Sequence, residues 1–178
     1  MYTDGEITIR PVRDEDMERL WELLYREENP EWKKWDAPYF THRTMPLDRF
    51  LEKRDEWVNS DDGWVIEANG IVIGTVTYYY EDEMKNWLEM GIGIYDPEWW
   101  GGGSGSKALR LWMDHLFSTL PLVRVGLTTW SGNERMVRVA EKLGMKMEAR
   151  IRNVRFYNNH YYDSIRMGIL REEWEQLP

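Results

Sequence analysis

The first third of the chain shows short strand-like and helix-like patterns of apolar residues. Residues 6–10 alternate apolar and polar side chains and are closed by Pro11, which predicts a short strand. Apolar positions recur every three or four residues over 14–26 and again over 46–58, and both patterns predict amphipathic helices. Residues 31–40 have no regular period and carry two tryptophans, so we expect a surface loop there.

The middle of the chain has the pattern of consecutive strands. Residues 64–68 and 71–76 flank Asn69-Gly70, a pair that a tight type I′ hairpin turn prefers. A further strand is predicted over 87–95, after a charged turn. Because no helix separates these strands, the pattern argues against a doubly wound parallel fold, which alternates strand and helix from the start.

The last third predicts two helices and three strands. One helix follows a run of glycines and serines, and a second opens on a capping-box pattern and stops at Gly144, as a C-terminal glycine would stop it. Asn158-Asn159, a pair that tolerates left-handed turn geometry, lies between the last two strands. The predicted strands are 123–128, 146–157 and 160–170.

The predicted order of elements is β-α-α-β-β-β-α-β-α-β-β. This order indicates an α/β fold around one strongly twisted mixed sheet. A length of 178 residues, without repeats or a linker, fits a single domain over 1–178.

Composition narrows the functional classes. The chain has 23 Lys and Arg against 32 Asp and Glu, a net charge of −9, and 42% hydrophobic residues, so it is not an intrinsically disordered chain. A polyanion would be repelled, so we expect no nucleic-acid partner, and a basic small molecule or basic protein segment fits better. The sequence allows a homodimer and does not determine the oligomeric state.

Cysteine is absent, which excludes disulfides, thiolate metal cages and a cysteine nucleophile. The three histidines show no metal-ligand spacing, so no metal is expected. The N-terminal residues do not resemble a signal peptide, and no apolar stretch is long enough to span a bilayer. We therefore expect a cytoplasmic protein without a membrane partner.

The most informative stretch is the glycine-rich run 101–106. A flexible linker has no domains to separate here, whereas glycines at a helix start expose backbone N–H groups that bind phosphate. A Walker A loop fails at Ser106-Lys107-Ala108. A dinucleotide-binding turn fits loosely over 103–108, but this stretch follows a hairpin and lacks an acidic residue ~20 positions on.

Residues 100–105, after the strand and Asp96-Pro97-Glu98, resemble the acyl-CoA pyrophosphate loop of the GCN5-related N-acetyltransferase (GNAT) family. Residues 133–145 resemble the Asn-led helix of that family, which ends in Lys-x-Gly-Phe, and 150–174 resemble its closing strand pair. The resemblance covers nearly the whole chain in the expected order and is nearest to the Rim-type branch of ribosomal-protein and small-molecule acetyltransferases. It implies a GNAT fold with a mostly antiparallel sheet and a splayed central strand.

The resemblance also implies acetyl-CoA as acyl donor. Gly91 and Gly93 weaken a strand unless something approaches its backbone closely, as pantetheine does in this family; alternatively they make room for bulky neighbours. Trp or Glu stands where the family has the first Arg or Gln of the loop, and Arg135 and Met136 follow Asn133 where small residues are common. The implied CoA contacts are Ile92, Gly93 and Ile94 for pantetheine, Trp100, Gly101, Gly102, Gly103, Ser104, Gly105 and Ser106 for the pyrophosphate, and Asn133 for the arm.

An ammonium must lose a proton before it can attack a thioester. The resemblance implies Glu89 as candidate base, although a solvent-facing strand carboxylate is the alternative. Ala140 stands where many family members have a tyrosine acid, which leaves Tyr157, with Tyr161 and Tyr162, as replacements by proximity only. Direct attack in a ternary complex needs no cysteine.

The implied acceptor site lies in the irregular segment before the second helix, where aromatic faces and a carboxylate suit a cationic amine. We expect an N-acetyltransferase acting on a primary amine of a small molecule or a protein N-terminus, and the sequence does not choose between them. A catalytically weak acyl-CoA-binding or regulatory module is the alternative, favoured by the missing tyrosine. The candidate acceptor contacts are Trp32, Trp35, Asp36 and Tyr39.

Overall fold

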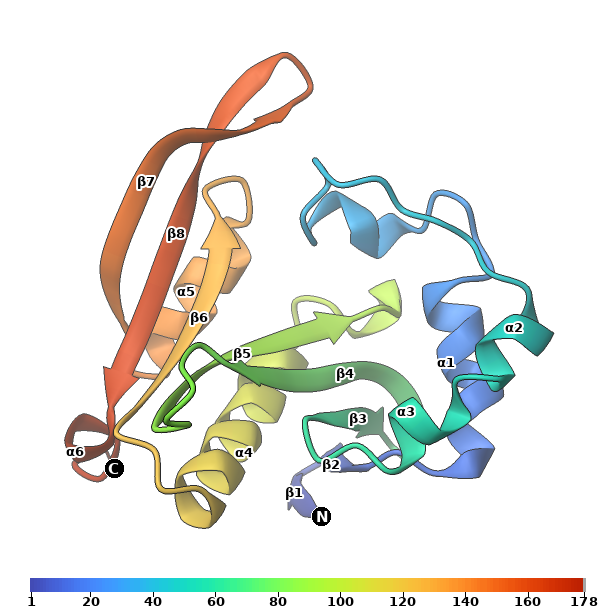
Figure 1. Ribbon diagram of the computed structural model, residues 1–178, viewed down its shortest axis with the longest axis horizontal. Helices are drawn as coiled ribbons and strands as arrows, with labels where there is room; N and C mark the ends of the chain where they lie inside the picture. Colours follow the sequence, from blue (N-terminus) through green and yellow to red (C-terminus); the bar gives the residue numbers. More distant parts are fainter. Residues whose placement is uncertain (178) are drawn as a thin grey trace.

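The computed structural model describes residues 1–177 and is built on one eight-stranded sheet of order β1-β2-β3-β4-β5-β6-β8-β7 (Figure 1). Neighbouring strands are antiparallel except β5 and β6, which are parallel. This mixed α/β architecture confirms the predicted fold class. The strands are β1 Tyr2–Asp4, β2 Ile7–Pro11, β3 Gly63–Ala68, β4 Ile71–Tyr80, β5 Trp87–Ile94, β6 Arg124–Trp130, β7 Lys146–Tyr157 and β8 His160–Leu170. The helices are α1 Met17–Leu24, α2 Leu47–Leu51, α3 Arg54–Val58, α4 Ser104–Thr119, α5 Glu134–Lys142 and α6 Arg171–Trp174.

Every predicted strand is present, and the differences lie in short elements. The helix predicted over 46–58 is two short helices, because Lys53 leaves helical geometry (φ −92°, ψ 10°) and only Phe50 of α2, and no residue of α3, is buried. Without a continuous apolar stripe, tertiary packing does not hold one long helix. The sequence reasoning also missed α6 and β1. Strand β1 has only three residues, too few for a visible alternation of apolar and polar side chains.

Helices pack on both faces of the sheet, whereas most of β7 is exposed. Helix α4 lies on one face, where its fully buried Trp112, Met113 and Leu116 join the larger apolar cluster. Helix α1 lies on the other face, where Leu20 and Phe50 of α2 join a second cluster. Burying a side chain of this size contributes roughly 1.5–3 kcal/mol, so both helices are held by packing. We call these two sides the α4 face and the α1 face.

The sheet opens between its two parallel strands. β5 and β6 pair only from Trp87–Arg124 to Glu89–Gly126, whereas β4 and β5 stay paired as far as Gly74–Ile94. Figure 1 shows β6, β8 and β7 diverging from β5 as one leaf of a V. Among the described residues, no strand pairs with the β6-facing edge of 90–94. The splayed central strand is thus confirmed.

Candidate active site

The V between β5 and β6 holds a cavity of about 640 Å³, lined from both sheet faces. It brings together most of the predicted site residues, although they come from four separate stretches of the chain. Gly102, Glu89 and Tyr157 are not among the lining residues found in 1–177. The predicted residues that do line it are Trp32, Trp35, Asp36, Tyr39, Ile92, Gly93, Ile94, Trp100, Gly101, Gly103, Ser104, Gly105, Ser106 and Asn133.

The glycine-rich run forms an open turn at the start of α4. Gly101 and Gly103 have φ values of +82° and +90°, a region that favours glycine, and Gly103 is the N-cap of the helix. A Cβ added at 101, 102 or 103 would meet no atom within 4 Å, so the backbone is accessible from outside. Trp100 fastens the turn to β5 by donating from Nε1 to the Ile94 carbonyl at 2.9 Å. Free N–H groups at a helix N-terminus make this turn suited to a phosphate group.

The glycines of β5 have a steric role on the α1 face. A Cβ at Gly91 would lie 2.8 Å from Oγ1 of Thr77, and one at Gly93 would lie 2.4 Å from the ring of Tyr95. The glycines therefore make room for Thr77 and Tyr95, not for tryptophans. The β6-facing backbone of the same segment is the edge along which an extended ligand could form strand-like hydrogen bonds.

Helix α5 places a basic stripe along the cavity that the sequence reasoning missed. Arg135, Arg138 and Lys142 all line it, and their spacing of three and four residues puts them on one face of the helix. Asp36 is the one acidic side chain in the lining found among the described residues. In a chain of net charge −9, this concentration of positive charge favours an anionic ligand next to the glycine turn. The i, i+3, i+7 spacing of the three cations was the available signal.

Segment 31–40 begins with the short 3-10 helix η2 (Glu31–Lys34) and is held across the opening through hydrogen bonds to one backbone oxygen. The carbonyl of Trp35 accepts from Nε1 of Trp130 at 2.8 Å and from Nδ2 of Asn133 at 3.2 Å. The guanidinium of Arg135 lies 4.4 Å from the ring centre of Trp35 and 5.7 Å from that of Trp100. Through these contacts, the segment spans from the α1 face to the first turn of α5.

The side chain of Asn133 has internal partners at both ends. Its Oδ1 accepts from the backbone N–H of Met136 at 3.2 Å and so caps α5, while its Nδ2 bonds Trp35. Its predicted contact with the CoA arm stays a prediction.

The predicted acceptor residues, three aromatic side chains and one carboxylate, all line the cavity. Trp32 is buried, donates from Nε1 to the Leu23 carbonyl at 2.9 Å, and meets the ring of Tyr95 edge-on at 5.1 Å. Tyr39 contacts the ring of Trp130 edge-on at 5.9 Å. Asp36 is exposed. Aromatic faces with one carboxylate suit a cation.

Glu89 is a buried carboxylate, with 1% of its surface exposed, so the solvent-facing alternative is wrong. Oγ1 of Thr128 donates to its Oε2 at 2.6 Å, and the Arg166 guanidinium lies 3.8 Å from its Oε1. Gly126 leaves the space for it, because a Cβ there would come within 2.7 Å of Oε1. Burial raises the pKa of Glu89 above its ordinary value, while Thr128 and Arg166 oppose that rise.

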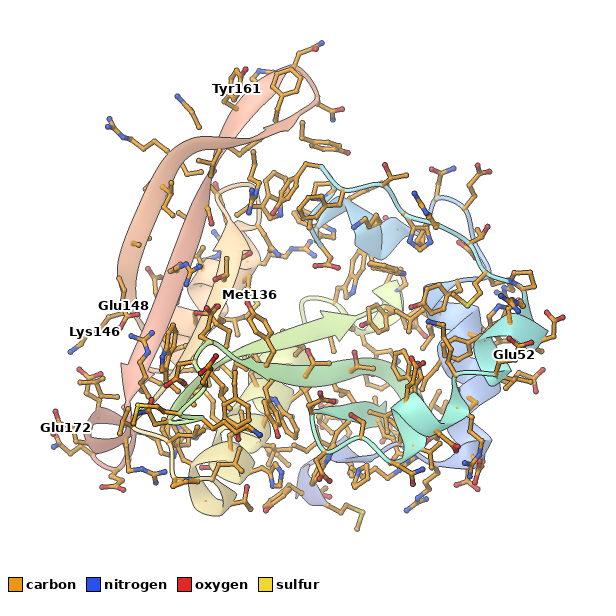
Figure 2. All side chains as sticks on the ribbon, in the orientation of Figure 1. Glu52, Met136, Lys146, Glu148, Tyr161 and Glu172 are labelled. Atoms are coloured by element: carbon orange, nitrogen blue, oxygen red, sulfur yellow. The ribbon has the colours of Figure 1, made fainter. Side chains whose placement is uncertain are left out.

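The predicted replacements for a tyrosine acid, Tyr157, Tyr161 and Tyr162, are not among the cavity-lining residues found in 1–177. Tyr157, on the β7–β8 arm, meets the ring of Trp130 at 6.2 Å, and Tyr161 lies at the far end of that arm (Figure 2). Tyr95, which the sequence reasoning did not single out, lines the cavity, and its hydroxyl is 2.7 Å from that of Thr75. Burial raises the pKa of the Tyr95 phenol, so it stays protonated at neutral pH.

Within the described part of the chain, no three His, Cys, Asp or Glu side chains are grouped closely enough to hold a metal ion. None of the helices in 1–177 has the length and apolar character that crossing a membrane requires.

Residues 6–146 match the family model described as acetyltransferase (GNAT) domain. The chain is 26% identical to spermidine N(1)-acetyltransferase of Escherichia coli (strain K12), covering 98% of this chain and 91% of that one. It is 28% identical to the putative ribosomal N-acetyltransferase YdaF of Bacillus subtilis (strain 168), covering 95% and 93%. The crystal structure of spermidine N-acetyltransferase from Vibrio cholerae in complex with CoA and spermine has the same fold, with a TM-score of 0.78, 22% identity, and 97% and 100% of the chains covered.

Proposed function

Because the chain belongs to the GNAT family and is therefore an acetyltransferase, we propose that it transfers an acetyl group from acetyl-CoA to a primary amine of a small molecule or a protein N-terminus. The single observation that carries this proposal is the cavity in the V, which joins the open glycine turn at the start of α4 to an aromatic end that contains Asp36. All of β8, and β7 after its first residue, lie beyond the family match but complete the same sheet, so we take 1–178 as one catalytic domain.

The donor end would bind acetyl-CoA mainly through backbone groups. The pyrophosphate fits the N–H groups of 101–106, and pantetheine fits the free edge of β5 at Ile92, Gly93 and Ile94. The basic stripe of α5 would attract the phosphates of CoA electrostatically. The Vibrio cholerae structure, which holds CoA in the same fold, supports this assignment.

The chemistry would be direct attack in a ternary complex. Glu89, as base, takes a proton from the ammonium; the amine attacks the thioester carbonyl, a C–N bond forms and the C–S bond breaks. The CoA thiolate leaves and takes up a second amine proton, and the amide product keeps the third. The chain contains no cysteine, so no acyl-cysteine intermediate is involved.

The acceptor end suits a cationic amine. Trp32, Trp35, Asp36 and Tyr39 all line this end of the cavity, and a cation gains from both aromatic rings and a carboxylate. A polyamine and a positively charged protein N-terminus both meet this description. One relative is named a spermidine acetyltransferase and the other a putative ribosomal acetyltransferase, which supports testing a small-molecule amine and a protein.

The test is thiol release from acetyl-CoA with a panel of amines: spermidine, spermine, an aminoglycoside, free amino acids and peptides with free N-termini. We expect turnover with at least one cationic amine. Acetyl-CoA should also raise the melting temperature, because it binds the native state, whereas NAD should not. Stabilisation by acetyl-CoA without thiol release for any amine would instead support the acyl-CoA-binding module, which Ala140 favours.

A further inference from the structure

We propose that Thr128 is the hydroxyl through which Glu89 receives the proton of the acceptor amine. This inference rests on the proposed function and goes beyond it, since it assigns the group that touches the substrate. Glu89 is only 1% exposed and is not among the lining residues found in 1–177, whereas Thr128 is exposed and lines the cavity. An amine held in the cavity therefore meets the hydroxyl before the carboxylate.

The geometry of the pair is that of a proton relay. Oγ1 of Thr128 donates to Oε2 of Glu89 at 2.6 Å, a short charge-assisted hydrogen bond. With its own proton directed to the carboxylate, the hydroxyl presents its lone pairs for a donor arriving from the cavity. An ammonium is such a donor.

The surrounding strands hold this pair in place. Glu89 pairs with Gly126 in the last step of the β5–β6 ladder, and Thr128 follows two residues later, on the same face of β6. The missing side chain of Gly126 lets the carboxyl group lie against β6. Thr128 itself is fixed by pairing with Arg166 of β8. The relay therefore lies at the point where the two leaves of the sheet part.

The charged and titratable groups around Glu89 come from three strands and one turn. Burial is the largest influence on its pKa and raises it. The hydrogen bond from Thr128 and the charges of Arg166 and Arg124 lower the pKa, while Glu81 raises it, and the phenol of Tyr79 also faces Glu89. The balance leaves a carboxylate that takes up a proton more readily than an exposed one does.

The proposed step conserves atoms and charge. The ammonium gives one proton to Oγ1 of Thr128 as the hydroxyl proton moves to Oε2 of Glu89. The neutral amine then attacks the acetyl carbonyl, the C–N bond forms, and the electron pair of the C–S bond leaves with the sulfur of CoA. The second amine proton goes to the thiolate, and Glu89 later releases its proton to water.

The test compares Thr128→Val, which keeps the shape but removes the hydroxyl, with Thr128→Ser, which keeps the hydroxyl. With the best amine, we expect Thr128→Val to lower kcat about 10- to 100-fold across the pH profile, including its plateau. The Thr128→Ser variant should keep most of the wild-type kcat. Thermal stabilisation by acetyl-CoA should not change. Thr128→Val combined with Glu89→Gln should be no slower than Glu89→Gln alone, because both remove one relay.

Thr8→Val is the matched control, since it removes a strand hydroxyl, 3.0 Å from that of Thr3, near the opposite edge of the sheet. If Thr128 only lowered the pKa of Glu89, Thr128→Val would shift the acidic limb of kcat/KM to higher pH, and the full rate would return above that limb. This result would overturn the relay. An active wild type with an unchanged Thr128→Val plateau would overturn it as well. Wild-type protein that releases no thiol with any amine would overturn the proposed function and the relay together.

Discussion

The two ends of the cavity are built from different parts of the chain. The proposed donor end consists chiefly of backbone, the turn of Gly101 and Gly103 and the free edge of β5, with the cations of α5 beside it. The proposed acceptor end consists of side chains, chiefly Trp35, Asp36 and Trp130, brought in from distant segments. Backbone groups are available to many sequences, whereas each side chain is a particular choice. We infer that the donor end defines the family and that the acceptor end defines the individual enzyme.

The largest effect should come from closing the donor turn with Gly103→Val. We expect acetyl-CoA affinity to fall about 100-fold or more, equivalent to about 2.7 kcal/mol, because the side chain would occupy the open approach to the backbone. The melting-temperature shift given by acetyl-CoA should then disappear at concentrations that saturate the wild type.

Gly70→Val is the control for backbone strain. Gly70 also has positive φ, +80°, and a Cβ there also meets no atom within 4 Å, but it lies in the β3–β4 turn and does not line the cavity. Both substitutions should cost roughly 1–2 kcal/mol of stability. Equal loss of CoA binding in both variants would refute the donor-turn assignment.

At the junction of the two ends, Glu89→Gln should lower kcat about 100-fold and leave acetyl-CoA affinity nearly unchanged. The wild-type kcat/KM should fall as pH drops through the raised pKa of Glu89, and this acidic limb should be absent from the variant. A neutral-pH rate equal to that of wild type would remove Glu89 from the mechanism.

The same substitution has an expected effect on stability. The pKa of Glu89 is raised in the folded state, so its proton stabilises the fold and part of that stability is lost as pH rises from the unfolded-state pKa through the folded one. Glutamine does not ionise. The free energy of unfolding of Glu89→Gln, relative to wild type, should therefore increase between acidic and neutral pH, as measured by urea denaturation. A relative loss over that interval would contradict the burial argument.

The smallest effect should come from the acceptor end with Asp36→Asn. We expect KM for a cationic amine to rise about threefold, with KM for acetyl-CoA unchanged, because the carboxylate is exposed and its field is screened by salt. The amine kcat/KM should also fall as ionic strength increases. Glu31→Gln, on the same segment but outside the cavity lining, is the matched control. An equal effect of both substitutions would indicate general charge attraction and not a site at Asp36.

The residues assigned to the proposed donor end could be singled out from the sequence because their signals are local. A run of glycines between a strand and a helix, and two glycines within a strand, can be recognised from neighbouring residues alone. The fold followed for a similar reason, since each strand carries its own alternation and each turn its own residues. The prediction of one helix over 46–58 failed because few apolar residues of that stretch are buried.

The parts that the sequence did not predict depend on contacts between distant segments. Tyr95 enters the cavity because its ring folds back over Gly93, and Thr128 reaches Glu89 across 39 residues of chain. Strand register decides both, and a shift of one residue would reverse the face. The basic stripe of α5 was visible as spacing, but only the direction of the helix shows that it faces the glycine turn.

The fastening of segment 31–40 has a consequence for how such an enzyme can change over generations. The side chains of Trp130 and Asn133 donate hydrogen bonds to the main-chain oxygen of Trp35, an atom that every amino acid has. The side chains at 35 and 36 could therefore be exchanged without detaching the segment. Substitutions there would change the acceptor amine with little effect on the folding of the rest of the chain. The segment is therefore a natural place for divergence between otherwise similar enzymes, and for the laboratory selection of variants that accept new amines.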